Sequence, residues 1–242
     1  EEPGAVKMFI AELKVSDGYK RNLVIVYNKY AKFFGISWTI PRYREPPKNI
    51  ALPTKEKLKM LIADAGNTLG TKLTLSMETG LRPVELMRLR VKDLDLDHKT
   101  VNPTTAKNGN PRTLPISESL KQKLEEHITH EKLAPNDRIF KGDSASYGKK
   151  YRQLRNRLAD KLKDPTIKNI RLYDLRHYLC TKKLNEIGNP YTVMVLMGHT
   201  KLETTQRYMH LLNFNDDDWT CVGATTAKEA TKLVEAGFQY VT

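Results

Sequence analysis

The segment Thr79-Gly80-Leu81-Arg82-Pro83-Val84-Glu85-Leu86 determines how the rest of this sequence is interpreted. An apolar run at residues 73–77 precedes it at helical spacing, and Gly80 is typical of the position that ends a helix. Pro83 suits the first turn of a following helix, where its missing N–H costs least. Glu85 lies three residues after Arg82, so the two side chains should share one helical face and form a charge-assisted pair. The segment therefore predicts an arginine of fixed orientation at a junction between two helices.

Three further segments combine arginine, histidine and tyrosine: Arg171-Leu172-Tyr173-Asp174-Leu175-Arg176-His177, Leu196-Met197-Gly198-His199-Thr200 and Thr204-Thr205-Gln206-Arg207-Tyr208-Met209-His210. A guanidinium suits a phosphate group because it is planar and carries several donors, and a tyrosine phenolate can attack phosphorus to form a covalent phosphodiester. In this order the four segments resemble the catalytic boxes of tyrosine recombinases, the family of phage and plasmid integrases. The resemblance covers roughly residues 54–210, and the sequence looks most like the integrases of archaeal mobile elements.

The resemblance implies site-specific DNA recombination, such as integration of viral, plasmid or other mobile DNA, through a covalent 3′-phosphotyrosine. Six side chains would be catalytic: Tyr208, Arg82, Arg176, Lys107, His199 and Tyr173. Tyr208 would attack the phosphate while Arg82 and Arg176 hold its oxygens and stabilise the transition state in place of a metal ion. Lys107, just before the Asn108-Gly109 turn, would protonate the departing 5′ oxygen. Because the covalent bond conserves the energy of the phosphodiester, we expect neither ATP nor another cofactor.

Two histidines and Tyr173 complete the expected site. His199 would donate to the phosphate or carry protons. His177 could act similarly, but it is adjacent to Arg176 and cannot point the same way from one helix, so we assign it, with Glu85, a supporting role. The family commonly has histidine where this chain has Tyr173, and a phenol is a poor base near neutral pH because its free pKa is about 10. Proton transfer is therefore expected to differ at this position.

Each of these side chains, taken singly, has an ordinary explanation. An isolated arginine is usually a solvated surface charge, and Tyr208 is one of eleven tyrosines, any of which could fill a hydrophobic gap. His199 could be a loop residue after Gly198. Lys107 could be a solvent-facing charge, and the same small sheet also contains Arg112 and Lys99. The combination of the four segments, and not any one residue, indicates an active site.

The net charge indicates a polyanionic partner. Lysine and arginine number 41 against 28 acidic residues, a formal charge of +13, which attracts nucleic acid. We expect double-stranded DNA to be contacted by basic residues of a proline-bearing connector and of one helix: Arg42, Arg44, Lys48, Lys149, Lys150, Arg152, Arg155 and Arg157. The resemblance implies a homotetramer on two paired DNA sites, with a monomer possible when DNA is absent.

The predicted fold is mainly α with a small antiparallel β-sheet, an α+β class that matches the tyrosine recombinase catalytic fold. Residues 1–44 would form a partial helical DNA-clamp domain, with two helices separated by a break at Asp17 and Gly18. Residues 45–53 would be the linker, 54–212 the catalytic domain and 213–242 a β-α-β-like tail. Alternating apolar residues from Leu94 to Ile116 predict the sheet, and helical spacing predicts helices on both sides of it.

Other classes of protein fit less well. No apolar stretch approaches the roughly 18 residues of a membrane span, and no secretory signal is visible. Cys180 and Cys221 give neither a disulfide framework nor zinc-ligand spacing, so we expect a cytoplasmic, nucleoid-associated protein. The acidic run at residues 216–218 is typical of a solvated loop, although it leaves open a metal-dependent nuclease. The resemblance also leaves open a type IB topoisomerase-like enzyme, which shares the tyrosine and arginine chemistry, and a non-catalytic DNA-binding protein.

Overall fold

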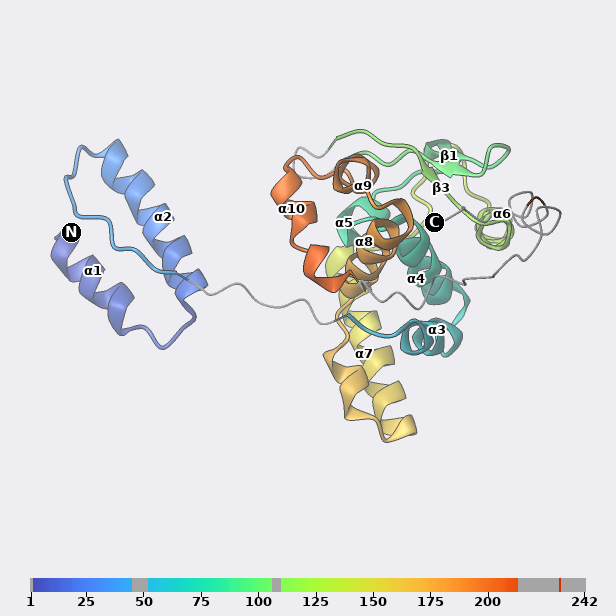
Figure 1. Cartoon of the computed structure of the whole chain (residues 1–242), viewed down its shortest axis with the longest axis horizontal. Coiled ribbons are helices and arrows are strands. Elements are labelled where there is room, and N and C mark those ends of the chain that lie inside the picture. Colours follow the sequence, from blue (N-terminus) through green and yellow to red (C-terminus); the bar gives the residue numbers. More distant parts are fainter. Residues whose placement is uncertain (1, 45–51, 106–109, 213–230, 232–242) are drawn as a thin grey trace. The chain divides into compact units, whose positions relative to one another are not determined.

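The computed structural model describes residues 2–44, 52–105, 110–212 and 231, and the chain divides into two compact units, Glu1–Ala51 and Leu52–Thr242 (Figure 1). The division falls within the predicted linker, residues 45–53. The predicted tail, residues 213–242, lies outside the described residues except for Thr231. Lys107 and the Asn108-Gly109 turn also lie outside them. No helix in the described ranges is long and apolar enough to cross a membrane.

The described part of the first unit, residues 2–44, contains two helices, α1 (Pro3–Glu12) and α2 (Asp17–Phe33). The two predicted helices are present, but the predicted break at Asp17 and Gly18 is wrong, because both residues lie in the first turn of α2. Ser16 is the N-cap, and its hydroxyl accepts from the backbone N–H of Tyr19 at 3.3 Å, which starts the helix one residue earlier than the glycine suggests. The ring of Trp38 packs edge-on against that of Tyr27, with 4.7 Å between their centroids.

The second unit is a helical body around one hydrophobic core. Its helices are α3 (Lys55–Ala63), α4 (Asn67–Thr79), α5 (Pro83–Leu86), α6 (Glu118–Glu131), α7 (Ser144–Leu162), α8 (Asp174–Ile187), α9 (Pro190–Met197) and α10 (Leu202–Gln206), with 3-10 turns at Val91–Asp93, Pro165–Asn169 and Met209–Leu211. Helix α4 packs against α3, α6 and α8. It ends at Gly80, which has a left-handed backbone (φ 62°) that favours glycine.

A small sheet lies beside these helices, as the alternating residues predict. Its strands are β1 (Leu94–Asp95), β2 (Thr100–Val101) and β3 (Leu114–Pro115), joined antiparallel in the order β1-β2-β3. Val101 pairs with both Leu94 and Leu114, and it is completely buried, as Leu114 nearly is. The mainly helical fold with a small antiparallel sheet is therefore confirmed.

Helices α8, α9 and α10 bring the distant segments together. Helix α9 contacts both α8 and α10, and α8 contacts α4 (Figure 1). Gly198 ends α9 with a left-handed backbone (φ 64°), so the chain turns sharply into the segment that contains His199. The ends of α4, α9 and α10 thus lie around α8.

Candidate active site

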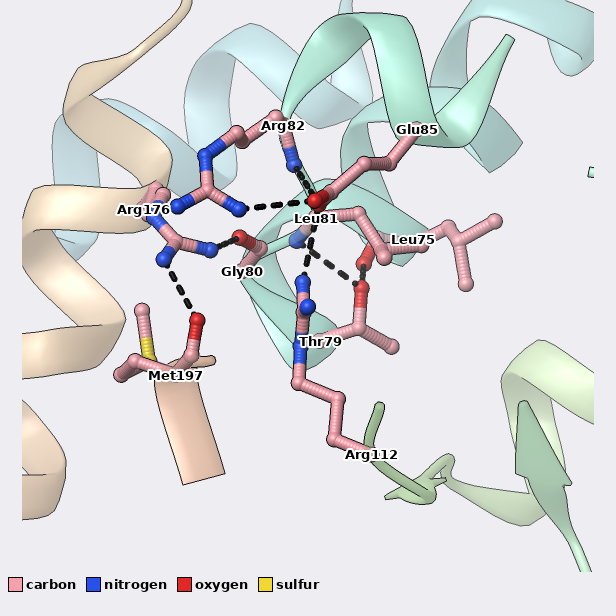
Figure 2. A network of polar contacts seen from close by, with 9 residues as sticks. All are labelled: Leu75, Thr79, Gly80, Leu81, Arg82, Glu85, Arg112, Arg176 and Met197. Carbon is pink, nitrogen blue, oxygen red and sulfur yellow. Dashed lines mark hydrogen bonds and ion pairs between the residues drawn. The ribbon is translucent and has the colours of Figure 1, made fainter. Parts of the chain in front are cut away.

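Arg82 is fixed at the junction between α4 and α5 by Glu85 (Figure 2). The backbone N–H of Arg82 donates to Oε2 of Glu85 at 2.9 Å, and Nη1 donates to Oε1 at 2.7 Å. The side chain of Arg82 is 17% exposed, whereas that of Glu85 is fully buried. The ion pair expected from the spacing is present, and part of the Arg82 side chain remains exposed.

Arg176 reaches the same junction from α8, although it is only 2% exposed. Its Nη1 donates to the carbonyl of Gly80, and its Nη2 donates to the carbonyl of Met197 at 2.6 Å (Figure 2). The guanidinium thereby joins the end of α4 to the end of α9. Burial lowers the pKa of Arg176, Tyr173 opposes the shift, and the charge of Arg82 adds to it. Two guanidiniums this close together favour an anion between or beside them.

A third guanidinium, that of Arg112, belongs to the same network. Its Nη2 donates to Oε2 of Glu85 at 2.8 Å, and its side chain is 3% exposed. Its Nε and Nη1 are buried without a hydrogen-bond partner among the described residues. A methyl group at Gly198 would lie 2.5 Å from Nη1, so the glycine makes room for the guanidinium. Burial opposes ionisation of Glu85, but hydrogen bonds and charge from Arg82 and Arg112 outweigh it and hold the pKa of this carboxyl below its ordinary value.

Arg112 is the residue of this cluster that the sequence interpretation missed, since it treated Arg112 only as another basic residue of the sheet. A signal was present in the strand pattern. Arg112 lies two residues before β3, and residues 112, 114 and 116 are buried in alternation, as in an extended segment with one inward face. An arginine on the inward face of a strand requires an acidic partner, and Glu85 supplies it.

His199 is buried (3% exposed) next to the arginine cluster. Its Nδ1 lies 2.8 Å from the hydroxyl of Thr205, and its backbone N–H donates to the carbonyl of Met194. Burial first, and then the charges of Arg176 and Arg82, lower the pKa of His199 to about 3. The imidazole is therefore neutral at physiological pH, and it can offer a ligand a hydrogen bond but no positive charge.

Tyr208 follows α10, and it is buried (4% exposed) against α8. Its hydroxyl lies 2.6 Å from Nδ1 of His177. Nε2 of His177 lies 4.0 Å from Oδ1 of Asp174, which is too far for a hydrogen bond, so the tautomer of His177 decides whether the phenol or Nδ1 donates in this contact. Burial raises the pKa of Tyr208 and lowers that of His177. The pair is therefore neutral, and the phenol and the imidazole share one short hydrogen bond.

Tyr173 lies at the start of α8 and is 38% exposed, with its ring edge-on to that of His177 at 5.0 Å between centroids. The four sequence segments thus converge in one region of the second unit. Lys107, the sixth residue of the predicted catalytic set, lies outside the described residues.

The residues predicted to contact DNA differ in their surroundings. Exposed positions are Arg42 and Arg44 in the first unit and Lys149, Lys150 and Arg152 on α7, whereas Lys48 lies outside the described residues. Arg155 is partly buried, and its Nη1 donates to the carbonyl of Ile170 at 2.9 Å. Arg157 is paired with Asp64 at 2.9 Å. The last two arginines therefore have internal partners, while the first five present their charge to solvent.

Comparison with known proteins identifies the family that this fold and cluster define. Residues 54–214 match the phage integrase family, and the chain belongs to that family. The match includes all four segments that form the site and most of the described part of the second unit.

Individual relatives are tyrosine recombinases. The chain is 30% identical over 193 residues to tyrosine recombinase XerA of Saccharolobus solfataricus, which covers 79% of this chain and 63% of that protein. It is 28% identical over 219 residues to XerA of Pyrococcus horikoshii, covering 83% and 73%. The chain thus spans less than two thirds of the Saccharolobus protein.

Solved structures share the fold. A crystal structure of XerA recombinase superposes with a TM-score of 0.58 at 19% identity, over 99% of this chain and 85% of that one. XerH site-specific recombinase bound to its difH substrate gives 0.64 at 20% identity, over 87% and 67%. The Tn1549 transposon integrase in complex with transposon right end DNA gives 0.65 at 17% identity, over 95% and 82%.

Proposed function

We propose that this chain is a site-specific DNA recombinase that cuts and rejoins strands through a covalent 3′-phosphotyrosine at Tyr208. One observation carries the proposal: Arg82 and Arg176, 94 residues apart in the sequence, meet at the Gly80 turn, and His177, the residue after Arg176 on α8, contacts Tyr208. Family membership and relatives named as tyrosine recombinases support it.

The reaction begins at the phenol of Tyr208. Nδ1 of His177, which is 2.6 Å from the buried phenol, accepts its proton as the phenol turns towards the phosphate, and the phenolic oxygen then bonds to phosphorus. The bond between phosphorus and the 5′ oxygen breaks, and this oxygen takes up a proton, for which Lys107 is the proposed donor. Attack by the 5′ hydroxyl of a second strand reverses the sequence and restores Tyr208. No net bond energy is lost, so no ATP is consumed.

The guanidiniums provide the electrostatic part of the mechanism. Arg82 is held by Glu85 and Arg176 by two carbonyls, so both are oriented before the phosphate binds, and little reorganisation is needed in the transition state. His199 contributes a neutral hydrogen bond, since its pKa of about 3 keeps it uncharged. Tyr173, the most exposed of the site residues, donates to the phosphate or to the DNA backbone.

The proposal includes a movement of Tyr208. The phenol is 4% exposed, and its hydroxyl contacts His177 of α8. Attack requires the 208 hydroxyl to turn outward towards the bound phosphate, in its own subunit or in a neighbouring one. DNA binding would supply the free energy for that turn.

Double-stranded DNA is the proposed partner, on which four copies assemble across two paired sites. The net charge of +13 and the exposed basic residues Lys149, Lys150 and Arg152 support DNA binding. Two proteins of the same fold, XerH and the Tn1549 integrase, have been solved in complex with DNA.

The test is covalent capture. The chain is incubated in EDTA with duplexes that carry a nick within randomised sequence. After cleavage close to the nick, the short fragment that carries the new 5′ hydroxyl diffuses away, so the strand cannot be rejoined and the adduct persists. We expect a protein–DNA adduct that survives denaturation, and sequencing of the attached strands then reveals the target. Tyr208→Phe should abolish the adduct, while Tyr191→Phe, which alters a tyrosine 63% exposed on α9, should retain it.

Each outcome distinguishes the recombinase from a different class of protein. An adduct with Tyr208→Phe would refute the assignment of the nucleophile. DNA binding without any adduct would favour a non-catalytic DNA-binding protein, and cleavage only with a divalent metal would favour a nuclease. Exchange between two marked duplexes distinguishes a recombinase from a topoisomerase-like enzyme, which reseals the same strand.

A further inference from the structure

Lys72 is an unusual residue in the middle of α4, the helix that ends at Gly80, and none of the four segments of the candidate site includes it. It is 5% exposed, yet it donates no hydrogen bond and forms no ion pair with any residue in the described ranges. Its ammonium lies over the rings of Phe140 and Tyr147, at 5.1 Å and 5.7 Å from their centroids. Ring faces attract a cation, but they do not replace the hydration that burial removes from an ammonium with three donors.

The side chain of Lys72 lines a surface depression of about 370 Å³. The other lining residues are Gly66, Asn67, Thr68, Leu69 and Lys150. None of them is acidic, and Lys150 adds a second positive charge from α7. Burial lowers the pKa of Lys72, and the charge of Lys150 lowers it further, so the two ammonium groups repel each other across this depression.

The same depression contains the N-terminus of α4. The N-cap is Gly66, which has no side chain to accept a hydrogen bond, and no acidic residue occupies the first turn. The first backbone N–H groups of a 13-residue helix, at Asn67, Thr68 and Leu69, therefore lack the usual capping oxygen. Their partial positive charge adds to that of the two lysines.

We propose that this depression is a phosphate-binding site, in which the Lys72 and Lys150 ammonium groups and the first-turn N–H groups of α4 hold one phosphate. A tetrahedral phosphate presents several oxygens, so it can accept from the helix terminus and from both lysines at once. The phosphate belongs either to the DNA backbone or to a small phosphorylated molecule. Lys149 and Arg152, which are exposed near Lys150 on α7, suit the first source. The site does not depend on strand cleavage, because Tyr208 takes no part in it.

The first measurement uses inorganic phosphate as the probe. Thermal unfolding of the full chain is followed with increasing phosphate and, at matched ionic strength, with chloride. We expect phosphate to raise the Tm beyond the effect of chloride. Lys72→Met should weaken the apparent phosphate affinity about tenfold, the effect of losing one charge-assisted contact. Lys55→Met is the matched control, because Lys55 is an exposed lysine at the start of α3 with no contact to the depression.

The second measurement is the salt dependence of binding to duplex DNA. If the site holds a backbone phosphate, Lys72→Met should reduce the slope of log K against log salt by about 0.9, the value for one phosphate contact. Lys55→Met should leave the slope unchanged. Lys150→Met repeats both measurements with a substitution at an exposed residue, in case Lys72→Met impairs folding.

The outcomes decide between the sources. An effect of Lys72→Met on DNA binding, or of Lys150→Met on both DNA binding and inorganic phosphate, assigns the site to the DNA backbone. An effect of Lys150→Met on DNA binding alone counts against the site, because Lys150 is also a separate proposed DNA contact. An effect on inorganic phosphate alone assigns it to a small phosphorylated molecule. If neither Lys72→Met nor Lys150→Met differs from Lys55→Met in either measurement, the proposal is wrong, whatever the result of the covalent capture experiment.

Discussion

Glu85 and Arg112 form one ion pair, but substitution of Glu85 should lower the free energy of unfolding more than substitution of Arg112. Glu85 is fully buried and accepts from both Arg82 and Arg112, whereas Arg112 has Nη2 bonded to Glu85 and two buried nitrogens without a partner among the described residues. Glu85→Gln removes the negative charge from beneath two guanidiniums. Breaking a buried ion pair in this way costs about 3–5 kcal/mol, because an uncompensated charge stays in the interior.

Arg112→Met removes the same bridge at a smaller cost. The methionine keeps an apolar stem, Glu85 keeps its 2.7 Å ion pair with Arg82, and the two unpartnered nitrogens of Arg112 disappear. Each buried donor left without a partner costs about 1–3 kcal/mol, so its removal offsets part of the loss. We expect a net destabilisation of about 1–2 kcal/mol, clearly smaller than that of Glu85→Gln.

Urea unfolding of the two single variants and of the double variant, followed by far-UV circular dichroism, measures these free energies. The double variant should lose about 1–3 kcal/mol less free energy of unfolding than the two single variants together. The reason is that Glu85→Gln leaves the Arg112 charge without its acidic partner only while Arg112 is present. If the effects add to within about 0.5 kcal/mol, or if Arg112→Met is the more destabilising substitution, the bridge does not stabilise the cluster as argued.

Three further predictions concern the same region. His199 has a folded pKa of about 3, below its ordinary value of about 6.5, so its contribution to stability is present above pH 6.5 and falls as the pH drops towards 3. Over that range the free energy of unfolding should decline by about 1.4 kcal/mol per pH unit. His199→Asn should flatten this part of a plot of stability against pH. Gly80→Ala should lower the Tm by several degrees relative to Gly4→Ala, which alters an exposed glycine without a positive φ. Gly80 has a φ of 62°, and its added methyl group would lie 2.9 Å from Cε of Met197. Equal Tm values would show that Gly80 is not needed at this turn. Adduct formation should slow as His177 becomes protonated, below its ordinary pKa range because burial lowers that pKa, and a rate that rises on acidification would exclude His177 as the proton acceptor for Tyr208.

Much of the local structure was predictable from short-range signals. Gly80 and Gly188 mark the ends of α4 and α8 because both ends need a left-handed residue, and Thr54 caps α3 through its hydroxyl. The ion pair between Arg82 and Glu85 follows from their separation of three residues. Ser16 was overlooked as a cap, so the start of α2 was misplaced.

The candidate site was only partly predictable. The sequence identified Arg82, Arg176, His199 and Tyr208 through their four segments, but it gave no sign that the phenol of Tyr208 would rest on His177. It also left Arg112 among the ordinary basic residues, although the alternating pattern that leads into β3 predicts an inward position for it. The burial of Lys72 was not predictable either, because a lysine in a helix is normally solvated.

The sequence by itself determined the element order, the family and the residue types available for chemistry, since helix ends, strand alternation and short motifs depend on neighbours within a few positions. Only the tertiary structure decided which charges are buried and which partners they have. Burial and partnership depend on residues far apart along the chain: Arg112 with Glu85 at a separation of 27, His177 with Tyr208 at 31 and Arg176 with Gly80 at 96. Contacts across such separations form when the whole core packs, and this packing changes the pKa of each side chain and hence its possible role.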